Sequence, residues 1–545
     1  MNTPRYFFRA FAATLLAITV SLLASACFSP WSGGGEGSVT LAFAPPAPSG
    51  RAFTPLNEPE PARRHVVTLQ GPRGTITHEF TGPGPERIAV LSGTWTVSVR
   101  AYGWFPSEGF DHVNNSFQPT TPLRAISLDA AVVEVVVGET TTASITMTHA
   151  AEVSTYEQLN GVLNYASDNR GMEKVIILAQ SFEITEDLSV GEEVGITLVS
   201  DAPVTITAAN SVADSMFSVG ADGTLRLGTP GMAGSITLDG AGQARIIEVA
   251  GGTLEMHGGV TLTGGNTNNN GGGVFVDESG EFIMHGGAIS ESTANSGGGV
   301  FVDGGEFTMH GGAISDNTAT SGGGVFVDGG EFTMHGGAIS DNTANFSGGV
   351  SVLGATSTFT MYGGTISSNE ADFGGGVEIE EGTFTMHSGT IYGNTAEGNG
   401  GGVTMGGEHS MFTMHGGTIA NNVAVGTGLT NGHGGGVLVG THTMFEMHGG
   451  TISGNTAEDN GGGVFVGAVN QDAYGTFYMA GGVIYGENAA GGFANTASGD
   501  GEAIYVMDGA TAQYGTFNNG TFSNMGDLQS TDDTIRVVSG VLLVE

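Results

Sequence analysis

The sequence has few basic residues and a single cysteine. Of its 545 residues, 14 are Lys or Arg and 54 are Asp or Glu, which gives a net charge of −40 at pH 7. A nucleic-acid partner needs a basic face that contacts phosphates, so this charge argues against nucleic-acid binding. One cysteine cannot form an internal disulfide or a cysteine-rich zinc site. No pattern in the sequence indicates a cofactor.

The first 27 residues have the plan of a secretion signal. A short basic start is followed by an apolar run over residues 11–24, which is shorter than the ~20 residues of a transmembrane helix. Cys27 directly follows Ala24-Ser25-Ala26, and this arrangement resembles the lipobox of bacterial lipoproteins. The resemblance implies that Cys27 carries a lipid and anchors the protein to a membrane of the cell envelope, at the outer membrane or cell surface. A plain signal peptide with an incidental cysteine is the alternative.

Two segments of different character follow the signal. Residues 28–37 are rich in glycine and are predicted to form a flexible linker. Residues 38–150 contain runs such as 93–100, in which apolar and polar side chains alternate with the period of a strand that has one wet face. Runs 65–69 and 132–137 are similar, so an antiparallel β-sandwich is predicted. This part resembles the Ig-like or prealbumin-like modules of bacterial surface proteins, most of which are spacers.

Residues 151–545 are predicted to form a parallel β-helix that begins with a short helix. Ser154-Thr155-Tyr156-Glu157 has the pattern of a capping box, and a helix here would cover the open edge of the first coil. A motif close to Phe-x-Met-His-Gly-Gly-x-Ile then recurs from about residue 250 to 490. Met284, Met309 and Met334 mark its basic period of 25 residues. Three strand candidates per repeat, with no room for a helix, indicate a solenoid of β-strands and an all-β fold.

Comparison of the repeats separates inward from outward positions. The residues that flank the centre of one strand are apolar in every repeat, as at Val300 and Val302, so they are predicted to face inward. The central residue varies and accepts polar side chains, so it is predicted to face water. Phe275, Phe301 and Phe326 would then form an exposed aromatic ladder, and exposed apolar patches often mark partner sites. The alternative is that stacked phenylalanines only stabilise the sheet.

Identical positions should stack, because neighbouring strands lie about 4.7–4.9 Å apart. Asn317 and its counterparts are predicted to stack in a turn. His285, His310 and His335 share one outward position, while Tyr362 interrupts the histidines. We expect simple stacking of these histidines and no metal, although adjacent imidazoles can share Zn²⁺ or Cu²⁺. One more column is either solvated charge or a Ca²⁺ ladder: Asp277, Asp303 and Asp328.

The repeats resemble those of bacterial surface proteins that form a right-handed parallel β-helix, the pectin lyase-like fold. Units such as Gly311-Gly312-Ala313-Ile314 are similar to those of polymorphic outer-membrane proteins. The resemblance implies a surface protein with a structural or adhesive role, whose partner is a glycan or a host or matrix protein. The alternative is a polysaccharide-active enzyme, a glycosidase or a lyase, since the fold hosts both classes. A uronate lyase is expected to use Arg or Lys, and neither occurs between Arg245 and Arg536. We predict no catalytic residue.

Overall fold

The structure is a computed structural model that describes residues 36–41, 64–71, 74–81, 86–91, 93–102, 123–127, 131–135, 147–168, 170–171, 173–426, 431–467, 474–487, 489–518, 521–531, 533–538 and 541–544. Cys27, the predicted signal and most of the predicted linker lie outside these residues. The chain divides into two compact units, Met1–Val153 with Glu173–Ile177, and Ser154–Met172 with Leu178–Glu545.

Strand pairing in the first unit is antiparallel, as the alternating pattern predicts. One pair is formed by β1 (Glu36–Leu41) and β4 (Glu86–Leu91). In the larger sheet, β2 pairs with β3 and β5, β5 pairs with β6 and β7, and β6 pairs with β8. The bounds are β2 (Arg64–Gly71), β3 (Gly74–Thr81), β5 (Gly93–Tyr102), β6 (Leu123–Ser127), β7 (Ala131–Val135) and β8 (Met147–Val153). Likeness to Ig-like or prealbumin-like modules stays a prediction.

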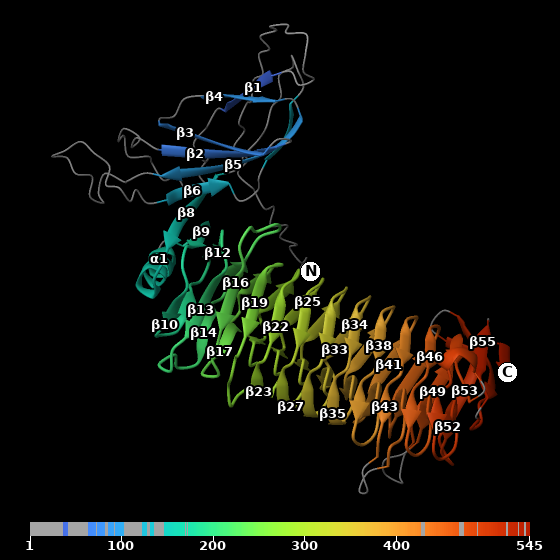
Figure 1. The fold of residues 1–545 in the computed structure, drawn as a ribbon. Coiled ribbons are helices and arrows are strands. Elements are labelled where there is room, and N and C mark those ends of the chain that lie inside the picture. The colour runs from blue at the N-terminus through green and yellow to red at the C-terminus, as the bar shows by residue number, and fades with distance from the viewer. Residues whose placement is uncertain are drawn as a thin grey trace, which may run out of the picture. The chain divides into compact units, whose positions relative to one another are not determined.

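The second unit begins with the predicted helix, α1 (Tyr156–Asp168), which buries Leu159, Leu163 and Ala166. Its buried side contacts β10 and β11 of the first coil, the place expected of a cap (Figure 1). The capping box lies one residue later than predicted. The Gln158 amide N donates to Thr155 Oγ1 at 3.4 Å, and the Gln158 side chain accepts a hydrogen bond from the Ser154 amide at 2.7 Å. The strand β9 (Glu173–Leu178) follows in the chain, and its residues Glu173–Ile177 belong to the first unit.

The rest of the second unit is a right-handed parallel β-solenoid, in which each coil gives one strand to each of several long sheets (Figure 1). We name the sheets after their recurring residues. The isoleucine sheet consists, before its last two strands, of β10 (Phe182–Ile184), β13 (Val204–Ala208), β16 (Ile236–Asp239), β19 (Val260–Thr263), β22 (Ala288–Ser290), β26 (Ala313–Ser315), β30 (Ala338–Ser340), β34 (Thr365–Ser367), β38 (Thr390–Tyr392), β42 (Thr418–Ala420), β46 (Thr451–Ser453) and β50 (Gly482–Ile484).

The valine sheet has 12 strands. They are β11 (Leu188–Val190), β14 (Ser215–Val219), β17 (Arg245–Val249), β20 (Val274–Val276), β24 (Val300–Asp303), β28 (Val325–Asp328), β32 (Val350–Leu353), β36 (Val377–Glu380), β40 (Val403–Gly406), β44 (Val437–Val439), β48 (Val464–Val466) and β52 (Ile504–Val506). From the fifth coil on, a short-strand sheet precedes it in each coil. That sheet consists of β23 (Thr293–Ser296), β27 (Thr318–Ser321), β31 (Thr343–Phe346), β35 (Glu370–Phe373), β39 (Thr395–Ala396), β43 (Val423–Ala424), β47 (Thr456–Ala457) and β51 (Thr496–Ala497).

The histidine sheet completes each coil. It consists of β12 (Gly195–Val199), β15 (Thr224–Leu227), β18 (Thr253–Met256), β21 (Glu281–Met284), β25 (Glu306–Met309), β29 (Glu331–Met334), β33 (Thr358–Met361), β37 (Thr383–Met386), β41 (Met411–Met414), β45 (Met444–Met447), β49 (Thr476–Met479) and β53 (Thr511–Asn518). Every pairing between neighbours in this series is parallel and without slippage, as in Phe307↔Phe332 and Met309↔Met334. Identical side chains therefore lie above one another.

The core of the solenoid is a stack of inward side chains. Phe282, Phe307 and Phe332 are at most 1% exposed, and each ring lies 4.7 Å from the next. Methionine at the end of the same strand and valine on the facing sheet fill the remaining space, as at Met309 and Val300, which are fully buried. Each buried Phe or Met contributes about 1.5–3 kcal/mol relative to exposure. The inward positions predicted from the repeats are confirmed.

From β26 on, a buried ladder of asparagines follows the strands of the isoleucine sheet, as predicted. Asn342 Nδ2 donates to Ile314 O at 3.0 Å and to Asn369 Oδ1 at 2.9 Å, and the Asn342 amide N donates to the same Oδ1 atom at 3.1 Å. Ser292 stands in the coil before the first asparagine, and its amide N donates to Asn317 Oδ1 at 3.0 Å. The ladder consists of Asn317, Asn342, Asn369, Asn394, Asn422, Asn455 and Asn495.

The last coil is covered by antiparallel strands. β54 (Thr521–Asp527) pairs with β53, and β55 (Ile535–Val538) pairs with β50 and with β56 (Val541–Val544). This change of direction occupies hydrogen-bonding groups at the end of the parallel stack. The only other helical element among the described residues is the short η1 (Ala490–Gly492). No helix in the described part of the chain is long and apolar enough to cross a membrane.

Candidate functional site

The outward face of the histidine sheet carries one continuous stack of aromatic rings. Each ring belongs to the residue that follows the inward methionine at the end of a strand. Neighbouring ring centroids lie between 4.7 and 5.3 Å apart. Tyr362 stacks on His335 at 5.1 Å and on His387 at 4.7 Å, so it continues the stack and does not interrupt it. The histidine ladder consists of His257, His285, His310, His335, Tyr362, His387, His415 and His448.

Backbone geometry fixes these rings in place. The His310 amide N donates to Met284 O of the preceding coil at 2.8 Å. The chain then turns at Gly312, whose φ is 96° and whose added Cβ would lie 2.6 Å from Met284 Cε. A left-handed conformation and a close approach thus both require glycine there. The glycine two residues after each ladder residue, which has a positive φ in every coil, holds the ring at the same place in successive coils.

The position two residues before the ladder residue distinguishes its ends from its middle. This position lies on the same outward face, and it is Glu255 at the first end and Glu446 at the last. Between them it is isoleucine or threonine, for example Thr308 and Thr333. Glu255, His257 and His285 bring one ligand atom each to within 4.8 Å of one another, and no other such group occurs among the described residues.

The sequence-predicted metal candidates are therefore brought together only in part. His285, His310 and His335 do stack, but His310 and His335 have threonine at the preceding outward position. Glu255 was not predicted as a ligand, because the equivalent position is isoleucine or threonine in the middle repeats. The sequence feature that could have identified it is a carboxylate two residues before the first histidine of the ladder.

Several ladder histidines resist protonation. Burial, followed by the positive charge that a protonated His285 would carry, lowers the pKa of His257. Burial and neighbouring histidines likewise lower the pKa of His310 and of His415. A lowered pKa leaves the imidazole neutral at neutral pH, and only the neutral form offers a nitrogen lone pair to a metal.

The two ends of the histidine ladder differ in their surroundings. Glu255 Oε1 lies 3.1 Å from Arg226 Nε on the preceding coil. At the other end, Glu446 Oε2 lies 3.2 Å from His448 Nε2. The hairpin of β53 and β54 covers that end, with Phe517 and Phe522 ring centroids 4.2 and 5.7 Å from the His448 ring. The first end of the ladder is the more open one, since His285 is exposed.

The phenylalanines Phe275, Phe301 and Phe326 do stack, but the prediction that they are exposed is wrong. Phe301 is 3% exposed and Phe326 6%, while Phe275 is half-buried. The chain before each strand folds back over the ring, so that a Cβ added to Gly297 would lie 2.8 Å from Phe301 Cβ. The rings stack at 5.6 and 5.1 Å, which stabilises the valine sheet. The exposure on which their partner-binding role rested is absent at Phe301 and Phe326.

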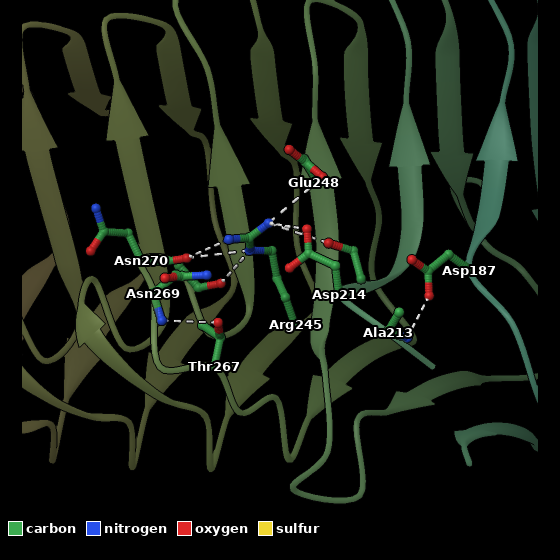
Figure 2. Close-up of polar contacts among 10 residues, drawn as sticks. Asp187, Ala213, Asp214, Arg245, Glu248, Thr267, Asn269 and Asn270 are labelled. Carbon is green, nitrogen blue, oxygen red and sulfur yellow. Dashed lines mark hydrogen bonds and ion pairs between the residues drawn. The ribbon is translucent and has the colours of Figure 1, made fainter. Parts of the chain in front are cut away.

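Arg245 lies over Phe275 at the first end of this phenylalanine column, and Figure 2 shows its polar contacts with neighbouring coils. Its side chain is 6% exposed, and its guanidinium carbon lies 4.9 Å from the Phe275 ring centroid. Nε donates to Asn270 O and Gly271 O, both at 3.2 Å. Further partners are Ser215 Oγ at 3.3 Å, Asp214 at 3.8 Å and Glu248 at 3.7 Å. Backbone carbonyls and side chains of the solenoid therefore satisfy the guanidinium group.

Glu378 occupies the equivalent position further along this column, and it is half-buried. Burial, followed by the negative charge of Glu380, raises the pKa of Glu378 to about 8. Glu378 is paired with Ser351 on one side and with Thr404 on the other. The side chain is therefore a neutral carboxylic acid at pH 7.

Asp277, Asp303 and Asp328 form an acidic column, and the first of them stabilises its turn through hydrogen bonds. Asp277 Oδ1 accepts hydrogen bonds from the Gly251 amide at 2.9 Å and from the Ser279 amide at 3.2 Å. Asp303 and Asp328 are exposed. Burial, followed by the charge of Asp303, raises the pKa of Asp328. These three aspartates do not converge on a common metal position in the described part of the chain.

Comparisons with protein-family models, with curated proteins and with solved structures found no match for this chain.

Proposed function

We propose that this protein is a lipid-anchored solenoid of the bacterial cell surface with a structural or adhesive role, and that its partner is a glycan or a host or matrix protein. The histidine ladder supports the adhesive role. It stacks seven histidines and Tyr362 in one register from His257 to His448, with ring spacings close to the distance between neighbouring strands. A surface of this kind suits an extended, repetitive ligand. It replaces the phenylalanine column as the candidate contact face.

The anchor is supported by the sequence around Cys27 alone. Cys27→Ser removes the sulfur that would carry the lipid, so the variant should leave the membrane fraction and lose incorporation of radiolabelled palmitate. Ser25→Ala is the matched control beside it and should keep both. Retention of palmitate labelling in Cys27→Ser would contradict the anchor.

A polysaccharide-active enzyme is the second candidate, and Glu378 is the observation that favours it. A glycosidase needs one carboxylic acid that stays protonated near neutral pH, together with a second carboxylate. Glu378 meets the first condition, and Glu380 lies two residues further on the same face of β36 (Val377–Glu380). A lyase that uses Arg245 is not supported, because that guanidinium is buried and held by backbone carbonyls.

One experiment separates these readings. The chain from residue 28 to residue 545 is screened against glycans and extracellular-matrix proteins, and release of reducing sugar is measured for every glycan bound. A variant with His310, His335, Tyr362 and His387 replaced by serine is compared with Asp303→Asn, an exposed change on another face. Binding lost only in the ladder variant supports the adhesive face. Sugar release that Glu378→Gln abolishes moves the function to a glycosidase. If the chain neither binds a ligand nor releases sugar, the structural role remains.

A further inference from the structure

The first end of the histidine ladder joins two neighbouring coils. Glu255 lies on β18, and His257 follows this strand by one residue, so both side chains lie on the same outward face. Met256 pairs with Met284 in parallel register, which places His285 of the next coil beside His257. Their ring centroids lie 4.7 Å apart with an interplanar angle of 13°.

We propose that Glu255, His257 and His285 bind one divalent transition-metal ion, with Zn²⁺ as the preferred ion. Two imidazoles and one carboxylate are a common set of three protein ligands for zinc, with the remaining position open to water. The ligand atoms of these residues already lie within 4.8 Å of one another. The two rings lie at only 13° to each other, so they must reorient to share the ion, because the lone pair of an imidazole nitrogen lies in the plane of its ring.

Burial and charge suit the site to this role. Glu255 and His257 are half-buried, whereas His285 is exposed, so an ion can enter from solvent and yet is partly shielded. The high acidic charge of the chain, −40, further favours a cation.

Arg226 opposes the ion. Its Nε atom lies 3.1 Å from Glu255 Oε1, and both side chains are mostly buried, at 28% and 21% exposed. The guanidinium stabilises the carboxylate when no ion is bound, and its positive charge repels a metal cation. Arg226→Gln should therefore strengthen metal binding, an outcome that simple loss of structure does not produce.

The rest of the ladder supplies internal controls. His310 and His335 stack with the same geometry, at 5.0 Å, but the outward positions before them are Thr308 and Thr333. These histidines lack the carboxylate of the proposed site. His310 stacks directly on the ligand His285, whereas His335 contacts neither ligand histidine, so His335→Gln is the matched change in ring chemistry outside the proposed site.

The test is calorimetric titration of the purified full-length chain with Zn²⁺, supported by the visible absorption of bound Co²⁺, which reports tetrahedral coordination. The expected result is one ion per chain. Affinity should fall by at least about tenfold in His257→Gln, His285→Gln and Glu255→Gln, stay unchanged in His335→Gln and rise in Arg226→Gln. Circular dichroism and the metal-free Tm verify that each variant is folded. Absence of binding, or binding equally weakened by His335→Gln, would overturn the proposal.

Discussion

Asn369 Oδ1 accepts two hydrogen bonds from Asn342 of the preceding coil, one from the side-chain amide at 2.9 Å and one from the backbone amide at 3.1 Å. Both side chains are at most 1% exposed. Asn369→Ala leaves donors without partners in a dry turn, so unfolding should become easier by about 2–4 kcal/mol. Chemical denaturation measures this loss. Asn345→Ala, an exposed change one coil earlier, should cost less than about 0.5 kcal/mol; equal losses would show that the buried amides contribute little.

The covered carboxyl of Glu378 should make stability depend on pH. Its pKa is raised from 4.5 to about 8, so the stability it contributes is complete below pH 4.5 and is lost as the pH rises through 8. Glu378→Gln removes this titration. Relative to the unmodified chain, the variant should gain roughly 2–4 kcal/mol between pH 5 and pH 9. Thermal unfolding at a series of pH values measures the difference, and a constant difference would contradict the raised pKa.

The histidine ladder should weaken the solenoid in acid. The pKa values of His257, His310 and His415 lie below the ordinary 6.5, so the unfolded chain binds protons first as the pH falls. The stability linked to these groups is present above pH 6.5 and is lost below it. Tm should therefore fall more steeply between pH 7 and pH 5 in the unmodified chain than in a variant with these three histidines replaced by glutamine. Parallel curves would refute this origin.

Glycine at the turn after each ladder residue should be indispensable. In Gly312→Ala, the new Cβ lies 2.6 Å from Met284 Cε and the residue must keep a φ of 96°. The expected cost is about 2–4 kcal/mol of unfolding free energy. Gly258→Ala is the control, because nothing lies within 4 Å of its added Cβ. Denaturant titration of the two variants gives the comparison. Similar values for both would mean that the turn tolerates a side chain.

The sequence was sufficient to predict the solenoid, the inward phenylalanines and the asparagine ladder, because identical residues in a parallel register must stack. It misplaced Phe301. Ser351 and Glu378 occupy the equivalent position in later coils, which indicated that this position is exposed to water. In the structure, the glycine segment before the strand covers the ring of Phe301. Glu378 is accommodated in the same column because its raised pKa keeps the carboxyl group neutral. Such cover depends on the three-dimensional path of the turn. The carboxylate of Glu255 was not predicted for another reason: most repeats carry threonine at this position, and glutamate occurs only at the two ends of the ladder.

The stacking of equivalent coils also bears on how the chain can change length. Residues 297–319 and 322–344 are identical in sequence, and each coil contacts its neighbours through the same register. Recombination between two identical segments would remove or add one whole coil while every remaining residue kept an equivalent neighbour. The length of the solenoid can thus change during evolution in steps of a single coil, without a change in how its coils pack.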